Sequence, residues 1–185
     1  MTHLDKLREL RENWQAPPEL ERSRPRPVRW TVKGFLTLLL AAGLLAGGLA
    51  LGFHIYSLTT RQTESAPAGQ SKRRGDAPPW VAPLVVASFW FSGIMLLREA
   101  LLERRLLEYG RAAPAIVTRL GRPTDKGRRV FYEFLTSGGS RAEGKYGPVH
   151  KSKQLQPGSA LTVIYDPENP GRNRKYPFRT VRISE

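Results

Sequence analysis

The chain has 185 residues, with 30 Lys and Arg against 16 Asp and Glu, so its formal net charge is +14. It contains no cysteine, which excludes a disulfide framework, a thiolate zinc site, an iron–sulfur cluster and a cysteine nucleophile. The three histidines (His3, His54 and His150) lie far apart in the sequence, in unlike settings, and indicate neither a metal site nor a catalytic triad. The mean hydropathy of −0.40 resembles that of a soluble basic protein but hides an uneven distribution of apolar residues.

The first 16 residues are predicted to form a short amphipathic helix. Four apolar residues share one face of this helix: Leu4, Leu7, Leu10 and Trp14. Acidic residues balance the basic ones on the polar face, so we expect a packing or oligomer contact rather than lipid binding. Residues 17–33 are predicted to be an extended, basic, Pro-rich linker that can lie against anionic headgroups.

Two uncharged apolar blocks follow, which we interpret as transmembrane helices over residues 34–56 and 80–97. About 20 residues at a helical rise of about 1.5 Å span roughly 30 Å, the thickness of the hydrocarbon core of a bilayer. A buried helix of a soluble protein rarely sustains such a run without a polar face. A cleavable signal peptide is the other alternative, but its apolar core is shorter than the first block.

Basic residues orient this predicted hairpin. They are concentrated before the first helix and after the second, whereas the exposed loop 57–79 carries fewer of them. Because cytoplasmic flanks are enriched in Lys and Arg, we expect a multi-pass membrane protein with both termini in the cytoplasm. Residues 98–110 continue the helical pattern and are predicted to form a stalk.

Small residues recur at four-residue spacing in the first apolar block, at Gly43, Gly47, Gly48 and Gly52. Such spacing lets helix backbones approach closely in lipid. Two interpretations stay open: a homodimer face, or packing inside the hairpin against Ser88 and Ser92 of the second helix.

From residue 112 the apolar period changes from that of a helix to that of strands. Short β-branched or aromatic runs separated by turn formers predict strands at 115–120, 129–135, 141–146, 160–165 and 179–183. The expected fold class is therefore an α+β membrane protein, a two-helix hairpin followed by a small antiparallel β barrel or sandwich over 112–183.

The order of motifs in this region resembles a known family. Gly110, Pro114, Ala115 and Val117 mark the first strand, Val130, Tyr132 and Phe134 the second, and Pro157-Gly158 precedes Leu161-x-Val-x-Tyr-Asp-Pro-x-Asn-Pro170. Over about residues 105–178 this is similar to the bacterial domain of unknown function 3592. The resemblance implies a small β domain tethered to transmembrane helices in a protein of the bacterial inner membrane, and it brings no activity or catalytic residues.

The most specific part of this resemblance is the turn motif formed by Tyr165, Asp166, Pro167, Asn169 and Pro170. It predicts a strand end followed by a rigid double turn, in which Asp166 and Asn169 bond their own backbone and Gly171 has a positive φ. A calcium loop is the alternative, but the spacing lacks the glycine and distal glutamate of such loops.

Residues 112–185 hold 14 Lys and Arg against six Asp and Glu, which predicts a basic surface on the β domain. We expect this surface to include Arg128, Arg129, Lys151, Lys153, Arg172, Arg174 and Lys175. Anionic lipid is one candidate partner, since each basic group near the inner leaflet contributes about 1 kcal/mol. Nucleic acid ranks below a protein partner or a homo-oligomer, and the charge is otherwise explained by topology and solubility.

No catalytic constellation is recognisable in the sequence. Glu133 lies in a predicted strand beside Arg128 and Arg129, where ion pairing is the simpler explanation. We expect no enzyme activity, cofactor or metal. The predicted function is a membrane-anchored binding or assembly module. The alternatives are an accessory subunit or stress-linked regulator of a membrane complex and, third, a membrane-tethered nucleic-acid-binding module.

Overall fold

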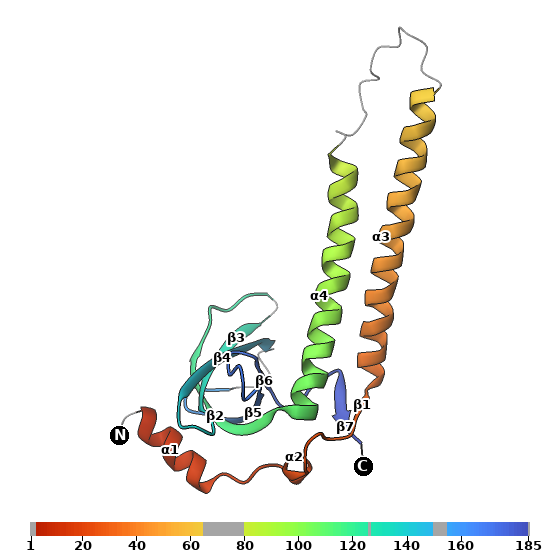
Figure 1. Ribbon diagram of the computed structural model, residues 1–185. Coiled ribbons are helices and arrows are strands. Elements are labelled where there is room, and N and C mark those ends of the chain that lie inside the picture. Colours follow the sequence, from red (N-terminus) through yellow and green to blue (C-terminus); the bar gives the residue numbers. More distant parts are fainter. Residues whose placement is uncertain (1–2, 65–79, 126, 150–154, 185) are drawn as a thin grey trace. The chain divides into compact units, whose positions relative to one another are not determined.

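A computed structural model describes residues 3–64, 80–125, 127–149 and 155–184 (Figure 1). Its elements in chain order are α1 (His3–Asn13), α2 (Pro18–Glu21), β1 (Val28–Trp30), α3 (Val32–Glu64), α4 (Val81–Tyr109), β2 (Arg111–Leu120), β3 (Arg128–Leu135), β4 (Arg141–Val149), β5 (Ala160–Tyr165), β6 (Asn173–Lys175) and β7 (Val181–Ile183). The chain forms two compact units. Met1–Thr31 and Leu102–Glu185 form one unit, and Val32–Leu101 form the other.

The unit Val32–Leu101 contains α3 and most of α4. By length and composition, both helices could cross a membrane. Large apolar side chains along both helices are exposed, among them Phe35, Leu49 and Phe91. The first helix is longer than predicted, because α3 continues to Glu64 and so into the expected loop 57–79. The rest of that loop, 65–79, lies outside the described residues. The predicted stalk 98–110 is the last part of α4 rather than a separate element.

The glycines of α3 divide into two pairs with different surroundings. A Cβ on Gly48 would lie 2.6 Å from Cδ1 of Trp90, and one on Gly52 would lie 3.7 Å from Val86 of α4. A Cβ on Gly43 or Gly47 would have no neighbour within 4 Å. Gly48 and Gly52 therefore make the packing contact inside the hairpin, whereas Gly43 and Gly47 do not.

The predicted partners Ser88 and Ser92 are exposed, and the nearest atoms to a Cβ on Gly48 or Gly52 belong to other residues of α4. The hydroxyls of Ser88 and Ser92 donate hydrogen bonds to the carbonyl oxygens of Val85 and Ser88, inside α4 itself, at 2.7 and 2.8 Å. The aromatic ring of Trp90 takes the space beside α3 because Gly48 has no side chain.

We expect Gly48→Leu to destabilise the hairpin by about 1–3 kcal/mol, because the added side chain overpacks the contact with Trp90. Gly47→Leu is the matched control, since it makes the same gain in helix propensity at an open position. The measurement is thermal unfolding of the full-length protein in detergent, followed by tryptophan fluorescence. Equal effects of both substitutions would contradict the assignment of the packing face.

The other unit contains a five-stranded antiparallel sheet in the order β4-β3-β2-β5-β6, which curls into a nearly closed barrel-like form (Figure 1). Its interior is built from alternate residues of neighbouring strands, as the period of two requires: Ala113, Ala115, Tyr132, Phe134, Val163 and Tyr165 are buried together. The predicted antiparallel β domain is thus present, in the barrel-like rather than the sandwich form.

Helix α1 covers part of the outer face of this sheet. Leu7 is buried against Ile116 of β2 and Leu135 of β3, and Leu10 packs beside it. The apolar face of the helix therefore makes an intramolecular packing contact, which is the role that its balanced charge favours over lipid binding.

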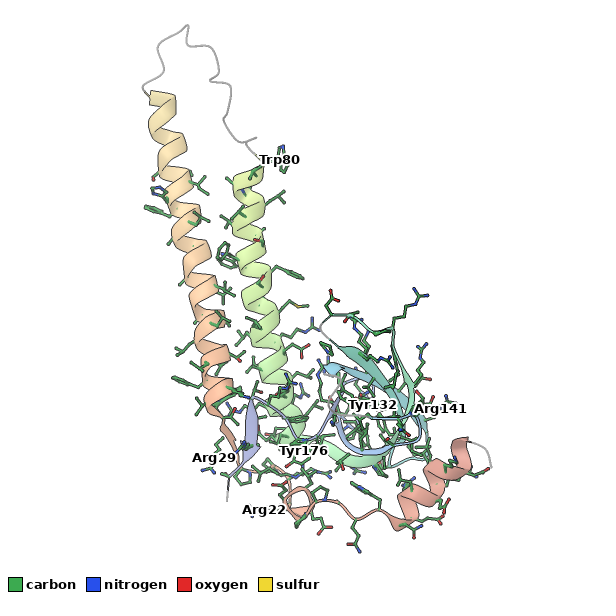
Figure 2. The ribbon with its side chains drawn as sticks, turned by 180° about the vertical axis from the view of Figure 1, so that it is seen from behind. Arg22, Arg29, Trp80, Tyr132, Arg141 and Tyr176 are labelled. Carbon is green, nitrogen blue, oxygen red and sulfur yellow. The ribbon has the colours of Figure 1, made fainter. Side chains whose placement is uncertain are left out.

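Asn173 joins the two edges of the curled sheet. Its side-chain oxygen accepts a hydrogen bond from the Tyr132 hydroxyl at 2.6 Å, and its amide donates to the carbonyl oxygens of Glu143 and Pro170. Tyr132 lies within the curled sheet in Figure 2, and burial raises the pKa of its hydroxyl well above the ordinary value. Gly144 of β4 leaves the room that this network occupies, because a Cβ there would collide with Asn173 and Tyr132.

The last strand and the predicted linker differ from the sequence prediction. Strand β7 does not join the sheet but pairs with β1, with Val28 opposite Ile183 and Trp30 opposite Val181 (Figure 1). Residues 17–33 are therefore not an extended linker: they contain α2 and β1. The physical reason is that a three-residue strand gains its stability from a distant partner, which local propensity does not reveal.

The β1–β7 pair, α2 and the last turns of α4 enclose a second apolar core. Leu20, Leu106, Leu107, Ile164, Phe178 and Val181 are buried in it. Hydrogen bonds surround this core. The Tyr176 hydroxyl donates to the Glu19 carboxylate at 2.5 Å, and the Thr180 hydroxyl donates to the Glu103 carboxylate at 2.5 Å. Tyr176 and Arg22 are labelled in Figure 2 in this part of the unit. Residues 18–31 and 176–184 therefore pack around the end of α4.

Candidate anion-binding pocket

A cavity of about 490 Å³ opens between the N-terminal segment and one end of the curled sheet. Three of its eleven lining residues are arginines that come from separate parts of the chain: Arg11 of α1, Arg24 from the segment after α2, and Arg111 of β2. The remaining lining residues are Trp14, Ala112, Ala113, Pro114, Leu135, Thr136, Ser137 and Tyr165. None of these lining residues is acidic.

Arg111 owes its position to the abrupt change from α4 to β2. The backbone N–H of Gly110 donates to the carbonyl oxygen of Leu106 at 2.8 Å, and the next residue, Arg111, already pairs with Tyr165 of β5. A Cβ on Gly110 would collide with the Leu106 carbonyl oxygen and would lie 2.6 Å from Ile164. Glycine therefore allows a strand to begin directly after the helix, at the rim of the pocket.

Arg24 is held at the pocket by its neighbour Arg26. The Arg26 guanidinium is buried, with only 2% of the residue exposed, and donates to the carbonyl oxygens of Leu20, Leu107 and Gly110 at 2.7–3.0 Å. Its backbone N–H donates to the carbonyl oxygen of Glu108 at 3.0 Å. These hydrogen bonds hold the segment around Arg26 against the end of α4, and Arg24 in the same segment therefore lies near Arg111.

The two arginines of the rim interact unfavourably. Partial burial lowers the pKa of the Arg24 guanidinium below its ordinary value, and the charge of Arg111 lowers this pKa further. Within the described parts of the chain, neither Arg24 nor Arg111 forms an ion pair with a carboxylate. An anion entering the cavity would relieve this repulsion.

Arg11 closes the pocket from the side of α1. Its guanidinium donates to the carbonyl oxygen of Ser137 at 3.2 Å, while the backbone N–H of Ser137 donates to the Tyr165 hydroxyl at 2.7 Å. Trp14 follows one helical turn after Arg11 and adds a half-buried indole to the lining. Because Leu7 and Leu10 fix α1 on the sheet, these side chains are positioned by packing as well as by hydrogen bonds.

The chemistry of this lining suits an anion with an apolar part. Guanidinium groups bind carboxylate and phosphate oxygens through paired, charge-assisted hydrogen bonds. The buried wall of Ala113, Pro114 and Leu135 adds apolar surface. The pocket is open to solvent on one side, and its volume, apolar wall and few polar groups suit a small molecule that stays partly exposed.

The basic residues predicted from the sequence do not form this pocket. Arg128 and Arg129 lie toward the opposite end of the sheet, where Val130 pairs with Leu120 and with Tyr146, and Lys175 pairs with Val163 of β5 without lining the pocket. The Lys175 ammonium lies 4.7 Å from the centre of the Tyr146 ring, and Arg174 pairs with Ile164 in the β5–β6 ladder. Lys151 and Lys153 lie outside the described residues.

The predicted turn motif is present as a structural element. The Asp166 carboxylate accepts a hydrogen bond from the Glu168 N–H at 3.1 Å and lies 4.0 Å from the Arg172 guanidinium, while Tyr165 is buried. The Asn169 N–H donates to the carbonyl oxygen of Asp166, and Pro167 and Pro170 occupy the same turn. The prediction for Gly171 was wrong: its φ is not positive, because the Arg172 N–H can close the turn on Asn169 without it.

Glu133 is explained by an ion pair, but with a different partner from the one predicted. Its carboxylate lies 2.6 Å from the guanidinium of Arg141 on the neighbouring strand, not beside Arg128 or Arg129. The β3–β4 register explains the choice, since Glu133 pairs with Glu143 and Arg141 is two residues away. Among the residues that the structure describes, no group of three or more His, Asp or Glu is arranged to hold a metal ion.

Sequence reasoning missed the pocket because its arginines belong to three unrelated local patterns. Arg11 lies in a charge-balanced helix, Arg24 in the predicted linker, and Arg111 between the predicted stalk 98–110 and the predicted β domain 112–183. The hydrogen bonds of Arg26 to the end of α4 and the packing of α1 on the sheet bring the three together. Comparisons of the chain with models of protein families, with curated proteins and with solved structures found no match.

Proposed function

We propose that this chain is a non-enzymatic, membrane-anchored binding module whose β-containing unit recognises an anionic group on its partner. The observation that carries the proposal is the pocket lined by Arg11, Arg24 and Arg111 and by no acidic residue. Three guanidiniums around one cavity favour occupation by an anion, which would also offset the repulsion between Arg24 and Arg111.

The two apolar helices supply the anchor in this proposal. Their candidate spans, Val32–Ser57 and Val81–Tyr109, expose most of their surface, with only 17% and 6% of the most apolar window buried. The core helix of a soluble protein would be mostly covered. Exposed apolar surface of this length has a natural environment in a lipid bilayer.

The proposed location is the bacterial inner membrane, with both termini and the β-containing unit in the cytoplasm. The excess of Lys and Arg before α3 and after the apolar part of α4 supports this orientation. That the membrane is bacterial rests on the proposed likeness of residues 105–178 to the bacterial domain of unknown function 3592, which the Tyr165-Asp-Pro-x-Asn-Pro170 motif carries.

We expect single cysteines introduced by Ser140→Cys and Ser71→Cys to react differently with an impermeant thiol reagent added to intact cells. Because the chain has no cysteine of its own, each variant reports one position. The proposed topology predicts labelling at position 71 and none at position 140 until the membrane is opened. Labelling of position 140 alone would place the β-containing unit outside and contradict the proposal.

Anion recognition has its own test on the full-length protein in detergent. At constant ionic strength, replacing chloride by phosphate, sulfate or benzoate is expected to raise the Tm. A ligand at ten times its Kd adds about 1.4 kcal/mol to the stability of the state that binds it. An unchanged Tm for all three anions would remove the support for an anionic partner.

A second candidate function is an accessory subunit or regulator of a membrane complex. This role is favoured by the packing of residues 18–31 and 176–184 around Leu102–Tyr109. A partner bound at the pocket would touch Arg24, which belongs to one of the segments that hold the end of α4. Binding of a protein, of a second copy or of anionic lipid would each be compatible with this role, and nucleic acid remains the third candidate.

A further inference from the structure

We propose that the pocket binds an organic phosphate monoester, with the phosphoryl group held by Arg11, Arg24 and Arg111 and a flat apolar body packed beside Trp14. This inference rests on the anion recognition proposed above and specifies the chemistry of the ligand.

The number of guanidiniums favours a phosphoryl group over a carboxylate. Each guanidinium carries five N–H donors, and one of them on Arg11 is used by the Ser137 carbonyl oxygen. A carboxylate has two oxygens and is satisfied by one or two forked arginines. A phosphate monoester has three terminal oxygens and a charge of about −1.5 to −2 near neutral pH, which matches three arginines better.

The shape and lining of the cavity favour a ligand larger than inorganic phosphate. The volume of about 490 Å³ falls within the range of roughly 300–1,000 Å³ that small organic ligands occupy. Trp14 offers a half-buried indole, and Ala112, Pro114 and Leu135 complete an apolar wall. An aromatic or other flat group can stack or pack there while its phosphoryl group meets the arginines.

The site can be tested without unfolding the protein. Arg24 and Arg111 are exposed at the rim, and neither forms an ion pair with the described residues. Neutralising either one also removes the repulsion between them. We therefore expect Arg24→Gln and Arg111→Gln to keep the Tm of the ligand-free protein, and to lose affinity.

The experiment is calorimetric titration of the full-length protein in detergent with four probes: inorganic phosphate, phenyl phosphate, benzoate and dihexanoyl phosphatidic acid. Phenyl phosphate is expected to bind at least about tenfold more tightly than inorganic phosphate or benzoate. Arg24→Gln and Arg111→Gln should each weaken phenyl phosphate binding about tenfold or more, which corresponds to about 1.4 kcal/mol. Arg122→Gln, an exposed arginine outside the pocket, is the matched control and should change nothing.

Trp14→Leu distinguishes the contribution of the apolar body of the ligand from that of its phosphoryl group. It should reduce the preference for phenyl phosphate over inorganic phosphate and leave the binding of inorganic phosphate unchanged. A preference that survives this substitution would overturn the assignment of Trp14 to the apolar body.

The remaining outcomes distinguish the two proposals and the two sources of ligand. Benzoate binding as tightly as phenyl phosphate would overturn the phosphate monoester and leave anion recognition standing. Binding of no probe, or equal losses for Arg122→Gln and Arg24→Gln, would overturn both. Tightest binding of the phosphatidic acid would identify a lipid headgroup as the phosphate monoester and overturn the flat apolar body, whereas tightest binding of phenyl phosphate supports a soluble ligand with a flat body.

Discussion

Replacing Arg26 with Met is expected to loosen the end of α4 and the segments around it by about 2–4 kcal/mol. The buried guanidinium donates to the carbonyl oxygens of Leu20, Leu107 and Gly110, so its loss leaves three buried acceptors without this donor. Two of these carbonyls, those of Leu107 and Gly110, lie at the C-terminal end of the helix, where the helix dipole also favours a cation.

The change can be measured locally by hydrogen–deuterium exchange of the full-length protein in detergent. Peptides from residues 18–30 and 102–112 should exchange roughly thirty to several hundred times faster in Arg26→Met, since 1.4 kcal/mol corresponds to a factor of ten. The exchange rates of Arg26→Lys should lie between those of the parent chain and those of Arg26→Met, because a single ammonium cannot reach carbonyl oxygens on both sides of the site. Arg29→Met is the matched control, since Arg29 is exposed on β1.

The same substitution connects stability to the proposed ligand site. Because Arg26 fastens the backbone beside Arg24, its loss should also weaken anion binding, although Arg26 does not line the pocket. Unchanged exchange in both peptides would show that the packing of Leu106, Leu107 and Val181 suffices to hold these segments.

The second large effect is expected at the junction of the sheet edges. Asn173→Ala removes a side chain that bonds the Tyr132 hydroxyl and the carbonyl oxygens of Glu143 and Pro170. The bond with the Tyr132 hydroxyl is buried, and the two bonds to carbonyl oxygens are partly buried. Because leaving a buried polar group unsatisfied costs about 1–3 kcal/mol, we expect the β-containing unit to lose about 2–4 kcal/mol of stability. Gly144→Ala should cost a similar amount, because its Cβ would collide with Asn173 and Tyr132.

Resistance to trypsin as a function of temperature measures this effect, since basic residues occur along the sheet and are cut when it opens. Both variants should be cleaved at lower temperature than the parent chain. Asn169→Ala and Gly138→Ala are the controls: Asn169 is exposed, and the nearest atom to a Cβ on Gly138 is the Thr136 hydroxyl oxygen at 4.0 Å. Controls as labile as Asn173→Ala would contradict a closing role for this network.

Much of the architecture follows from local patterns. The two uncharged blocks identify α3 and the apolar part of α4, and alternation of β-branched and aromatic residues identifies β2 to β5. The face of α1 that packs on the sheet was predictable from the spacing of Leu7 and Leu10. These elements are long enough for their own periodicity to reveal them.

Short segments were predictable only in part. Strand β6 has the polar sequence Asn-Arg-Lys and carries no local strand signal, and β1 lies in a Pro-rich basic segment. Each becomes a strand because a distant partner offers its hydrogen bonds, β5 for β6 and β7 for β1. The use of Gly48 rather than Gly47 for packing depends in the same way on where Trp90 lies.

The sequence alone determined a basic chain without cysteine, two helices of membrane-spanning length and an antiparallel β domain, because composition and short-range periodicity carry that information. The tertiary structure decided where the positive charge matters. The Arg26 guanidinium is buried and hydrogen-bonded to backbone carbonyl oxygens, whereas Arg11, Arg24 and Arg111 line one cavity. Charges counted along a chain add without regard to distance, but their effect on a ligand depends on the long-range pairing that brings them together.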